Sequence, residues 1–142
     1  MKTKLPSILV VLAVVTFGVA VFSAGFYARP KYDQRQENAA AVVASKFVKN
    51  LTAGDNDAAY SLTSKNLQSK QTKEQFVVDM PGLKADKPEF VAPQVARLKG
   101  TILYTQSVNN LPPTTSGKTT GDFYIGVVKE DGAWKVDTAS VR

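Results

Sequence analysis

The sequence predicts an α+β domain that follows a single N-terminal transmembrane helix. Three observations predict it. An uncharged apolar run of 24 residues, 5–28, lies near the start of the chain. Apolar residues then recur at spacings of three and four as far as Met80, and alternating apolar and polar residues follow from Glu89 onward. Helices that precede hairpin-connected strands are typical of α+β domains, here about three helices packed on a four-stranded antiparallel curved sheet.

The apolar run is long enough to cross a membrane. A transmembrane helix needs ~20 apolar residues, and the run at 5–28 exceeds that length. We therefore predict a short cytoplasmic tail and membrane anchor over residues 1–28, and a polar stalk over 29–37. Membrane lipid would contact residues 5–28. A cleaved signal peptide is the alternative, because Ser23-Ala24-Gly25 offers a cleavage site, although such peptides normally have an apolar region of about 7–15 residues.

Positive charges flank the run on both sides, so they favour neither topology strongly. They are Lys2 and Lys4 before it, and Arg29, Lys31 and Arg35 after it. The short N-terminal tail favours an arrangement with that tail inside the cell. The expected location is therefore the cell membrane, with a single pass and an extracytoplasmic C-terminal domain over residues 38–142.

The chain contains no cysteine and no histidine. Without cysteine there are no disulfides, thiolate metal ligands or cysteine nucleophiles. Without histidine the commonest general base and metal ligand is missing, which excludes a Ser-His-Asp triad. We therefore expect no catalytic residue, no metal and no cofactor. The net charge of +6 is spread among interleaved acids without an arginine cluster, so nucleic-acid binding is not expected.

The first helix of the domain is expected to begin at Glu37 and to end at Gly54, a residue that often follows the last turn of a helix. Its apolar residues fall on one face. They are Ala40, Val43, Ala44, Phe47, Val48 and Leu51. Lys46 and Lys49 fall on the opposite face, which we expect to be solvated.

Two further helices should follow. Asp55 is a suitable cap for a short second helix. Residues 64–67 form either a turn or a further helical turn. Thr72 and Gln75 have the spacing of a capping box, which predicts a third helix that ends at Pro81-Gly82.

The remaining segments predict strands. Residues 89–98 predict one strand with a bend at Pro93, and residues 101–108 predict the next. The segment 109–120, rich in proline, glycine, serine and threonine, predicts a long loop.

The last two strands are expected at 122–129 and 133–141. Asp131-Gly132 between them is a strong signal for a two-residue hairpin turn. Strict alternation along the final strand would place Trp134, Val136 and Thr138 on one face.

Two segments resemble the nuclear transport factor 2-like (cystatin-like) superfamily, in its bacterial membrane-anchored type. Residues 44–62 are similar to the opening of that domain, with a helix, the Gly54-Asp55 break, and a helix that carries the Ala59-Tyr60 pair. Residues 124–136 are similar to its closing hairpin, with a Gly-x-Trp-x-Val pattern. The resemblance covers residues 38–142. The short strand expected between the second and third helices is not found.

The resemblance implies a cone-like fold, in which a curved sheet surrounds a long helix and leaves a pocket at the wide end. Isomerase and dehydratase members of this superfamily rely on Asp or His together with Tyr. Because histidine is absent here, the candidate ligand-binding residues are tyrosines, one tryptophan and one carboxylate. They are Tyr60, Tyr104, Tyr124, Trp134 and Asp137.

Each candidate also has a structural interpretation. Tyr104 and Asp137 could form an acid–base pair, or Tyr104 could pack across strands while Asp137 is solvated. Trp134 could stack on a sugar ring, or it could close the core.

The predicted function is a membrane-anchored extracytoplasmic interaction or scaffold module without catalytic activity, whose partner is another protein or a second copy of the chain. One alternative is a small-molecule binding protein or pocket enzyme of the same fold. Another is a pilin-like or secretion-system assembly subunit.

Overall fold

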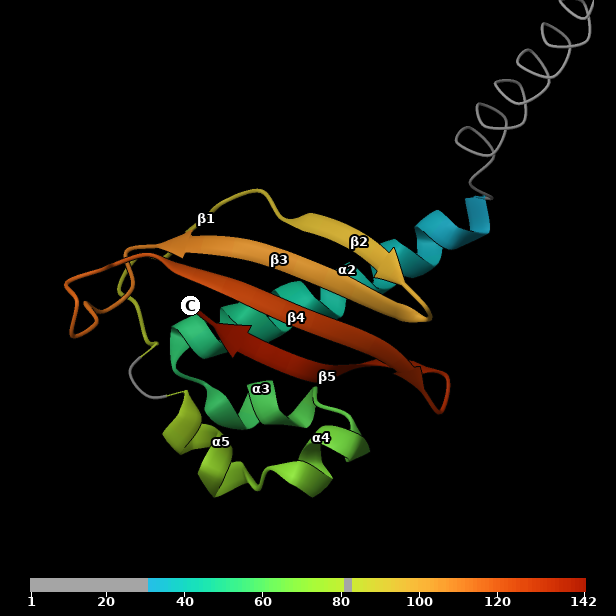
Figure 1. Cartoon of the computed structure of the whole chain (residues 1–142), viewed down its shortest axis with the longest axis horizontal. Helices are drawn as coiled ribbons and strands as arrows, with labels where there is room; N and C mark the ends of the chain where they lie inside the picture. The colour runs from blue at the N-terminus through green and yellow to red at the C-terminus, as the bar shows by residue number, and fades with distance from the viewer. Residues whose placement is uncertain (1–30, 81–82) are drawn as a thin grey trace, which may run out of the picture. The chain divides into compact units, whose positions relative to one another are not determined.

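The computed structural model describes residues 31–80 and 83–142, which form the helices and strands in Figure 1. The chain divides into two compact units, Met1–Arg35 and Gln36–Arg142, and the fold below is that of the second. The predicted anchor at 5–28 lies outside the described residues. Among the helices that are described, none is both long and apolar enough to span a bilayer.

α2 (Lys31–Ala53) carries the apolar face that the sequence predicts. Its fully buried residues are Ala40, Ala44, Phe47, Val48 and Leu51. The predicted start at Glu37 is wrong, because the helix begins at Lys31. The segment that precedes Glu37 contains glutamine, arginine and aspartate but no glycine or proline after Pro30, so nothing in it interrupts a helix. Gly54, at φ 78°, follows the helix as predicted.

Three short helices follow, and a side-chain cap begins each one. They are α3 (Asn56–Ser61), α4 (Lys65–Lys70) and α5 (Lys73–Asp79). The cap oxygens belong to Asp55, Ser64 and Thr72, which accept from backbone N–H groups at 3.0, 3.0 and 3.2 Å. The caps predicted at Asp55 and Thr72 are confirmed, and residues 64–67 belong to a helix. The described residues thus contain four helices, where about three were expected.

The strands form one antiparallel sheet. They are β1 (Glu89–Phe90), β2 (Gln94–Leu98), β3 (Thr101–Asn109), β4 (Gly121–Glu130) and β5 (Ala133–Val141). The order is β1-β3-β4-β5, and β2 also pairs with β3. Five strands replace the four expected, because the predicted strand 89–98 is interrupted. Pro93 lacks an N–H, and both pieces pair with β3 on either side of this interruption.

The strand missing between the second and third predicted helices is reduced to one bridge. Thr63 forms an isolated parallel bridge with Val136 of β5. Val136 N–H donates to the Leu62 carbonyl at 2.9 Å, and Ser64 N–H donates to the Val136 carbonyl at 2.8 Å. A single residue is too short for sequence alternation to reveal it.

A β-bulge lies in β5. Gly126 pairs with Thr138 and Val127 pairs with Val136, so Asp137 is the extra residue. The bulge reverses which residues face the helices beyond this point. Thr138 is exposed, whereas Ala139 and Val141 pack against the core. The predicted common face of Trp134, Val136 and Thr138 is therefore wrong at Thr138.

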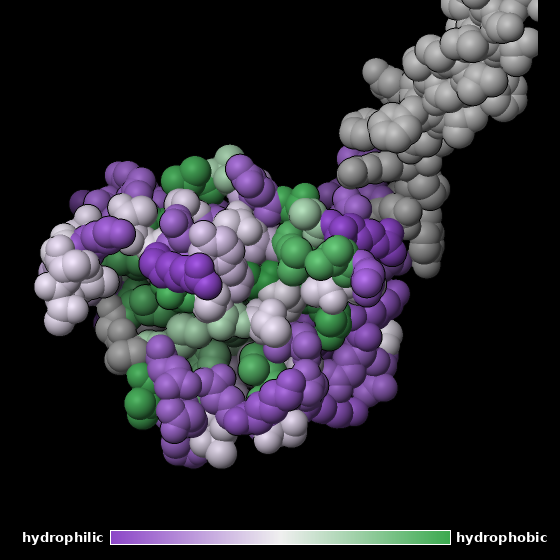
Figure 2. Space-filling view, viewed as in Figure 1, coloured by the Kyte–Doolittle hydropathy of each residue, from purple (hydrophilic) through white to green (hydrophobic). Residues whose placement is uncertain are grey.

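The helices cover one face of the curved sheet (Figure 1). Alternate residues of β3 are buried on that face, namely Ile102, Tyr104, Gln106 and Val108. The opposite face is open to solvent, with Leu103 and Tyr124 at 39% and 42% exposure. Figure 2 shows hydrophilic and hydrophobic residues mixed over the side of the domain in view.

The β4–β5 hairpin has the predicted two-residue turn. Asp131 and Gly132 lie at φ 50° and 82°, both in the left-handed region that the type I′ turn requires. We expect Gly132→Ala to lower the free energy of unfolding by about 1 kcal/mol, because a Cβ is strained there. Gly132→Asn is the matched control and should lose less, since asparagine tolerates this conformation. Urea titrations would measure the free energy of unfolding of both variants. Equal losses would contradict the interpretation that the positive φ at Gly132 causes the strain.

Candidate functional site

A cleft of about 720 Å³ lies between α2 and the β1–β3 side of the sheet. α2 contributes Asn38, Ala41, Val42, Ser45, Lys46 and Lys49, and the sheet side contributes Phe90, Pro93, Tyr104 and Gln106. No residue of β2 is buried, so the helices leave this edge of the sheet uncovered beside the cleft. Val42 is 67% exposed and Phe90 is 37% exposed at its mouth. The apolar side chains of Val42 and Phe90 are thus exposed to solvent at the cleft.

The two buried polar side chains of the cleft are already hydrogen-bonded. Tyr104 Oη donates to Gln106 Oε1 at 2.7 Å, and Gln106 Nε2 donates to the Val91 carbonyl at 2.9 Å. Tyr104 and Gln106 are both buried. These hydrogen bonds join the β1–β2 connection to β3, and the two side chains make them within the protein.

Burial raises the pKa of the Tyr104 hydroxyl, and a hydrogen-bonding contact with Ser45 opposes this only in part. The phenol therefore stays protonated at neutral pH. No carboxylate lines the cleft within the described residues. The cleft accordingly offers hydrogen-bonding groups and the positive charge of two lysines, without a carboxylate among its described lining residues.

Lys46 and Lys49 give the α2 side of the cleft its positive charge. They are three residues apart on the helix, so their side chains are neighbours. Both are exposed. Within the described residues, the ion pairs involve Lys65 and Lys73, and neither Lys46 nor Lys49 has a carboxylate partner.

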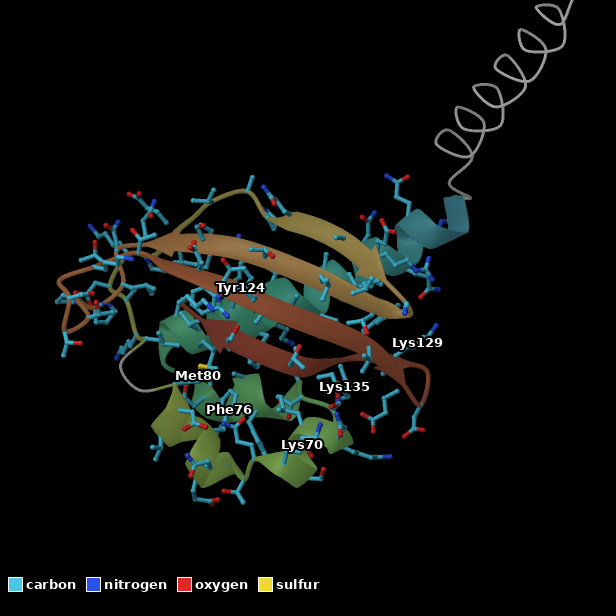
Figure 3. All side chains as sticks on the ribbon, in the orientation of Figure 1. Lys70, Phe76, Met80, Tyr124, Lys129 and Lys135 are labelled. Carbon is cyan, nitrogen blue, oxygen red and sulfur yellow. The ribbon has the colours of Figure 1, made fainter. Side chains whose placement is uncertain are left out.

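Of the five candidates from the sequence, Tyr104 lines this cleft and the other four do not. Tyr60 donates to the Gln71 carbonyl at 2.9 Å and packs on the Phe76 ring at 5.4 Å between centroids, so it joins α3 to α5. Tyr124 lies on the open face of the sheet (Figure 3), with the Arg142 guanidinium 5.7 Å from its ring.

Trp134 packs partly buried against the core, with Lys129 Nζ 5.9 Å from its ring. Asp137 accepts from Ser64 Oγ at 2.6 Å and from Asn66 Nδ2 at 2.9 Å. Tyr104 and Asp137 therefore have different partners, and the structure does not bring them together as an acid–base pair. Among the residues described, no three potential metal ligands gather in one place.

Asp137 at the bulge holds the start of α4 against β5. The hydrogen bonds from Ser64 and then Asn66 lower the pKa of this carboxyl. We expect Asp137→Ala to lower the free energy of unfolding by about 1–3 kcal/mol at pH 7, because the buried Ser64 hydroxyl loses its acceptor. Asp86→Ala, at an exposed carboxylate, is the control and should change it by less than about 0.5 kcal/mol.

The effect of Asp137 should also depend on pH. Because the folded-state pKa is lowered, the contribution is complete above the unfolded-state value of about 4 and is lost as pH falls through the folded-state value. Asp137→Asn keeps an acceptor oxygen but does not titrate. The stability difference between the wild type and this variant should therefore shrink below about pH 4, as followed by urea unfolding. A difference that stays constant from pH 7 to pH 3 would contradict the role of the carboxylate.

Sequence reasoning missed most of the cleft. The sequence predicts Lys46 and Lys49 on the solvated side of the first helix and places Gln106 in the strand at 101–108, without assigning either feature to a site. One signal was present: Val42 places an apolar residue outside the predicted buried face. A polar residue at 106, between the apolar positions Tyr104 and Val108 on the same face, was a second signal.

No family model matches the chain, and no curated protein matches its sequence. Solved structures do. A nuclear transport factor 2-like protein of unknown function from Shewanella baltica OS155 aligns over 80% of this chain and 97% of its own chain, with 11% identity and a TM-score of 0.57. A candidate ketosteroid isomerase from Shewanella frigidimarina NCIMB 400 aligns over 73% of this chain and 94% of its own, with 14% identity and a TM-score of 0.55. These similarities show that the domain has a nuclear transport factor 2-like fold.

Proposed function

We propose that this protein is a non-catalytic interaction module, held at the outer side of a cell membrane by residues 5–28, whose cleft between α2 and the β1–β3 edge receives part of a partner. The cleft carries this proposal. It combines exposed apolar side chains with two lysines that lack ion-pair partners among the described residues, and its buried polar groups are bonded to each other. Such a site can bind a partner, and the described residues that line it include no carboxylate to act as a general base.

The membrane location rests on the sequence. The run at 5–28 has the length and composition of a transmembrane helix. We expect the full chain to stay in the membrane fraction after alkaline carbonate extraction, and a protease added outside the cell to reach the domain. Release by carbonate would contradict the anchor, and protection of the domain in intact cells would contradict the topology.

The cleft itself can be tested by site-specific photo-crosslinking in native membranes. A benzophenone amino acid in place of Val42, at the cleft mouth, should give a discrete crosslinked product in the full chain. The same group in place of Leu103, an exposed residue on the other face of the sheet, is the control and should give none. Crosslinking at Leu103 alone would contradict a role for the cleft.

A small-molecule binding function is the second candidate. The cleft volume of about 720 Å³ lies in the range of ligand sites, and one structural neighbour is a candidate ketosteroid isomerase. A binder of this kind would label the cleft with a compound rather than with a protein. Mass spectrometry of the Val42 product separates the two, because a protein adduct adds the mass of a polypeptide.

A further inference from the structure

Exposed apolar residues also lie beside the cleft. Val95 of β2 is 40% exposed and pairs with Tyr104, which lines the cleft, so the two side chains lie on the same face of the sheet. β2 pairs with β3 alone among the described strands, so its far edge is also open. Exposed apolar residues beside a cleft are typical of an interaction site.

The charge of the cleft rim restricts which partners can bind. Lys46 and Lys49 lie at the α2 rim of the cleft without carboxylate partners in the described part of the chain. The lining residues include no aspartate or glutamate. A cationic partner would therefore meet repulsion at this rim, and an anionic one would be attracted to it.

The buried polar side chains of the cleft restrict which part of a partner can enter it. Because Tyr104 and Gln106 satisfy each other and the Val91 carbonyl, the two buried polar side chains of the cleft have no free hydrogen-bonding group to offer a partner. The part of the partner that enters must be apolar, since a polar group placed there would lose its hydrogen bonds to water. The cleft is open to solvent rather than enclosed, which suits the side chains of a polypeptide segment better than a small molecule that needs most of its surface buried.

We propose that the occupant of this cleft is an acidic segment of a partner protein, which inserts one or more large apolar side chains between Val42 and Phe90 and places carboxylates beside Lys46 and Lys49. This inference rests on the proposed function, because it assigns the chemistry of the partner to the same cleft. In this interface, insertion of the apolar side chains supplies most of the affinity, and the charges at the edge of the cleft supply selectivity.

Selection from a displayed library of random 12-residue peptides tests it without knowledge of the natural partner. The target is the full chain in nanodiscs of phosphatidylcholine, a lipid without net charge. A peptide is counted as dependent on the cleft if it binds the wild-type chain but does not bind the Val42→Glu variant. We expect these peptides to be enriched in Asp and Glu around Leu, Phe, Met or Trp, and to bind about tenfold more weakly to the K46E/K49E variant.

The charge reversal should also change what is selected. With K46E/K49E as the target, the enriched peptides should carry Lys or Arg around the same apolar residues. K87E/K118E is the matched control, because it changes the net charge equally at exposed sites away from the cleft lining, and it should still select acidic peptides. Thermal unfolding of each variant within about 2 °C of the wild type would exclude a folding defect.

Three results would overturn the inference. Cleft-dependent peptides without an acidic bias, or with the same bias on K46E/K49E, would show that the lysines do not select the partner. Binding of palmitate that is lost in K46E/K49E, with no cleft-dependent peptide, would assign the cleft to an anionic lipid instead. In either case a polypeptide adduct at Val42 would still support the proposed function, whereas a lipid adduct there would support the small-molecule alternative. Absence of any cleft-dependent peptide together with no product at Val42 would overturn both.

Discussion

Phe76→Ala is expected to lower the free energy of unfolding by about 3–5 kcal/mol. Phe76 is the buried residue of α5, and its ring packs against the rings of Phe47 and Tyr60 at 6.0 and 5.4 Å between centroids. A seven-residue helix is not stable alone, so α5 depends on this contact. Removal of the ring leaves a cavity where α2, α3 and α5 meet.

The neighbouring Val78 provides the control for Phe76. It lies on the same helix but is 66% exposed, so Val78→Ala should change the free energy of unfolding by less than about 0.5 kcal/mol. Urea unfolding of the full chain in detergent, followed by far-ultraviolet circular dichroism, measures both. If Phe76→Ala costs no more than Val78→Ala, α5 does not rely on this side chain for its position.

Tyr104→Phe and Gln106→Leu are each expected to cost about 1–3 kcal/mol of stability, because each leaves a buried polar partner without its hydrogen bond. Tyr104→Phe leaves Gln106 Oε1 without its donor. Gln106→Leu removes the acceptor of the Tyr104 hydroxyl and the donor to the Val91 carbonyl. The double variant should lose less than the sum of the two, by about 1 kcal/mol, since it removes both members of the pair.

This double-mutant cycle distinguishes two roles for Tyr104. If the hydroxyl were reserved for a ligand, Tyr104→Phe would leave stability unchanged and the cycle would show no coupling. A coupling of the expected size assigns the hydroxyl to the architecture of the cleft wall. Ser107→Ala, on the other face of β3, is a suitable control because its hydroxyl donates to Asp122 rather than to this pair.

Periodicity and capping chemistry predict much of this fold. The spacing of Ala44, Phe47, Val48 and Leu51 identifies the buried face of α2, because only one face of a helix can meet the sheet. The caps at Asp55 and Thr72 are visible because they act within three residues. The Asp131-Gly132 turn is visible for the same reason.

Features that depend on contacts distant in sequence could not be predicted. The bulge at Asp137 follows from how β5 must bend to meet both β4 and Ser64, which lies 73 residues away in the chain. The cleft likewise depends on which edge of the sheet the helices leave uncovered. The apolar Val42 outside the predicted buried face is a local signal, but it does not identify which edge of the sheet is uncovered, so most of the residues predicted from the sequence lie elsewhere.

β2 has a consequence for how the domain fluctuates. Its five residues are all exposed, and it is joined to the rest of the sheet through β3 alone among the described strands. Opening free energies vary within a protein, and segments with few buried contacts separate first. β2 should therefore open more readily than β3–β5 and α2. The stability of this strand beside the cleft is then set locally, and is largely independent of the global stability of the domain.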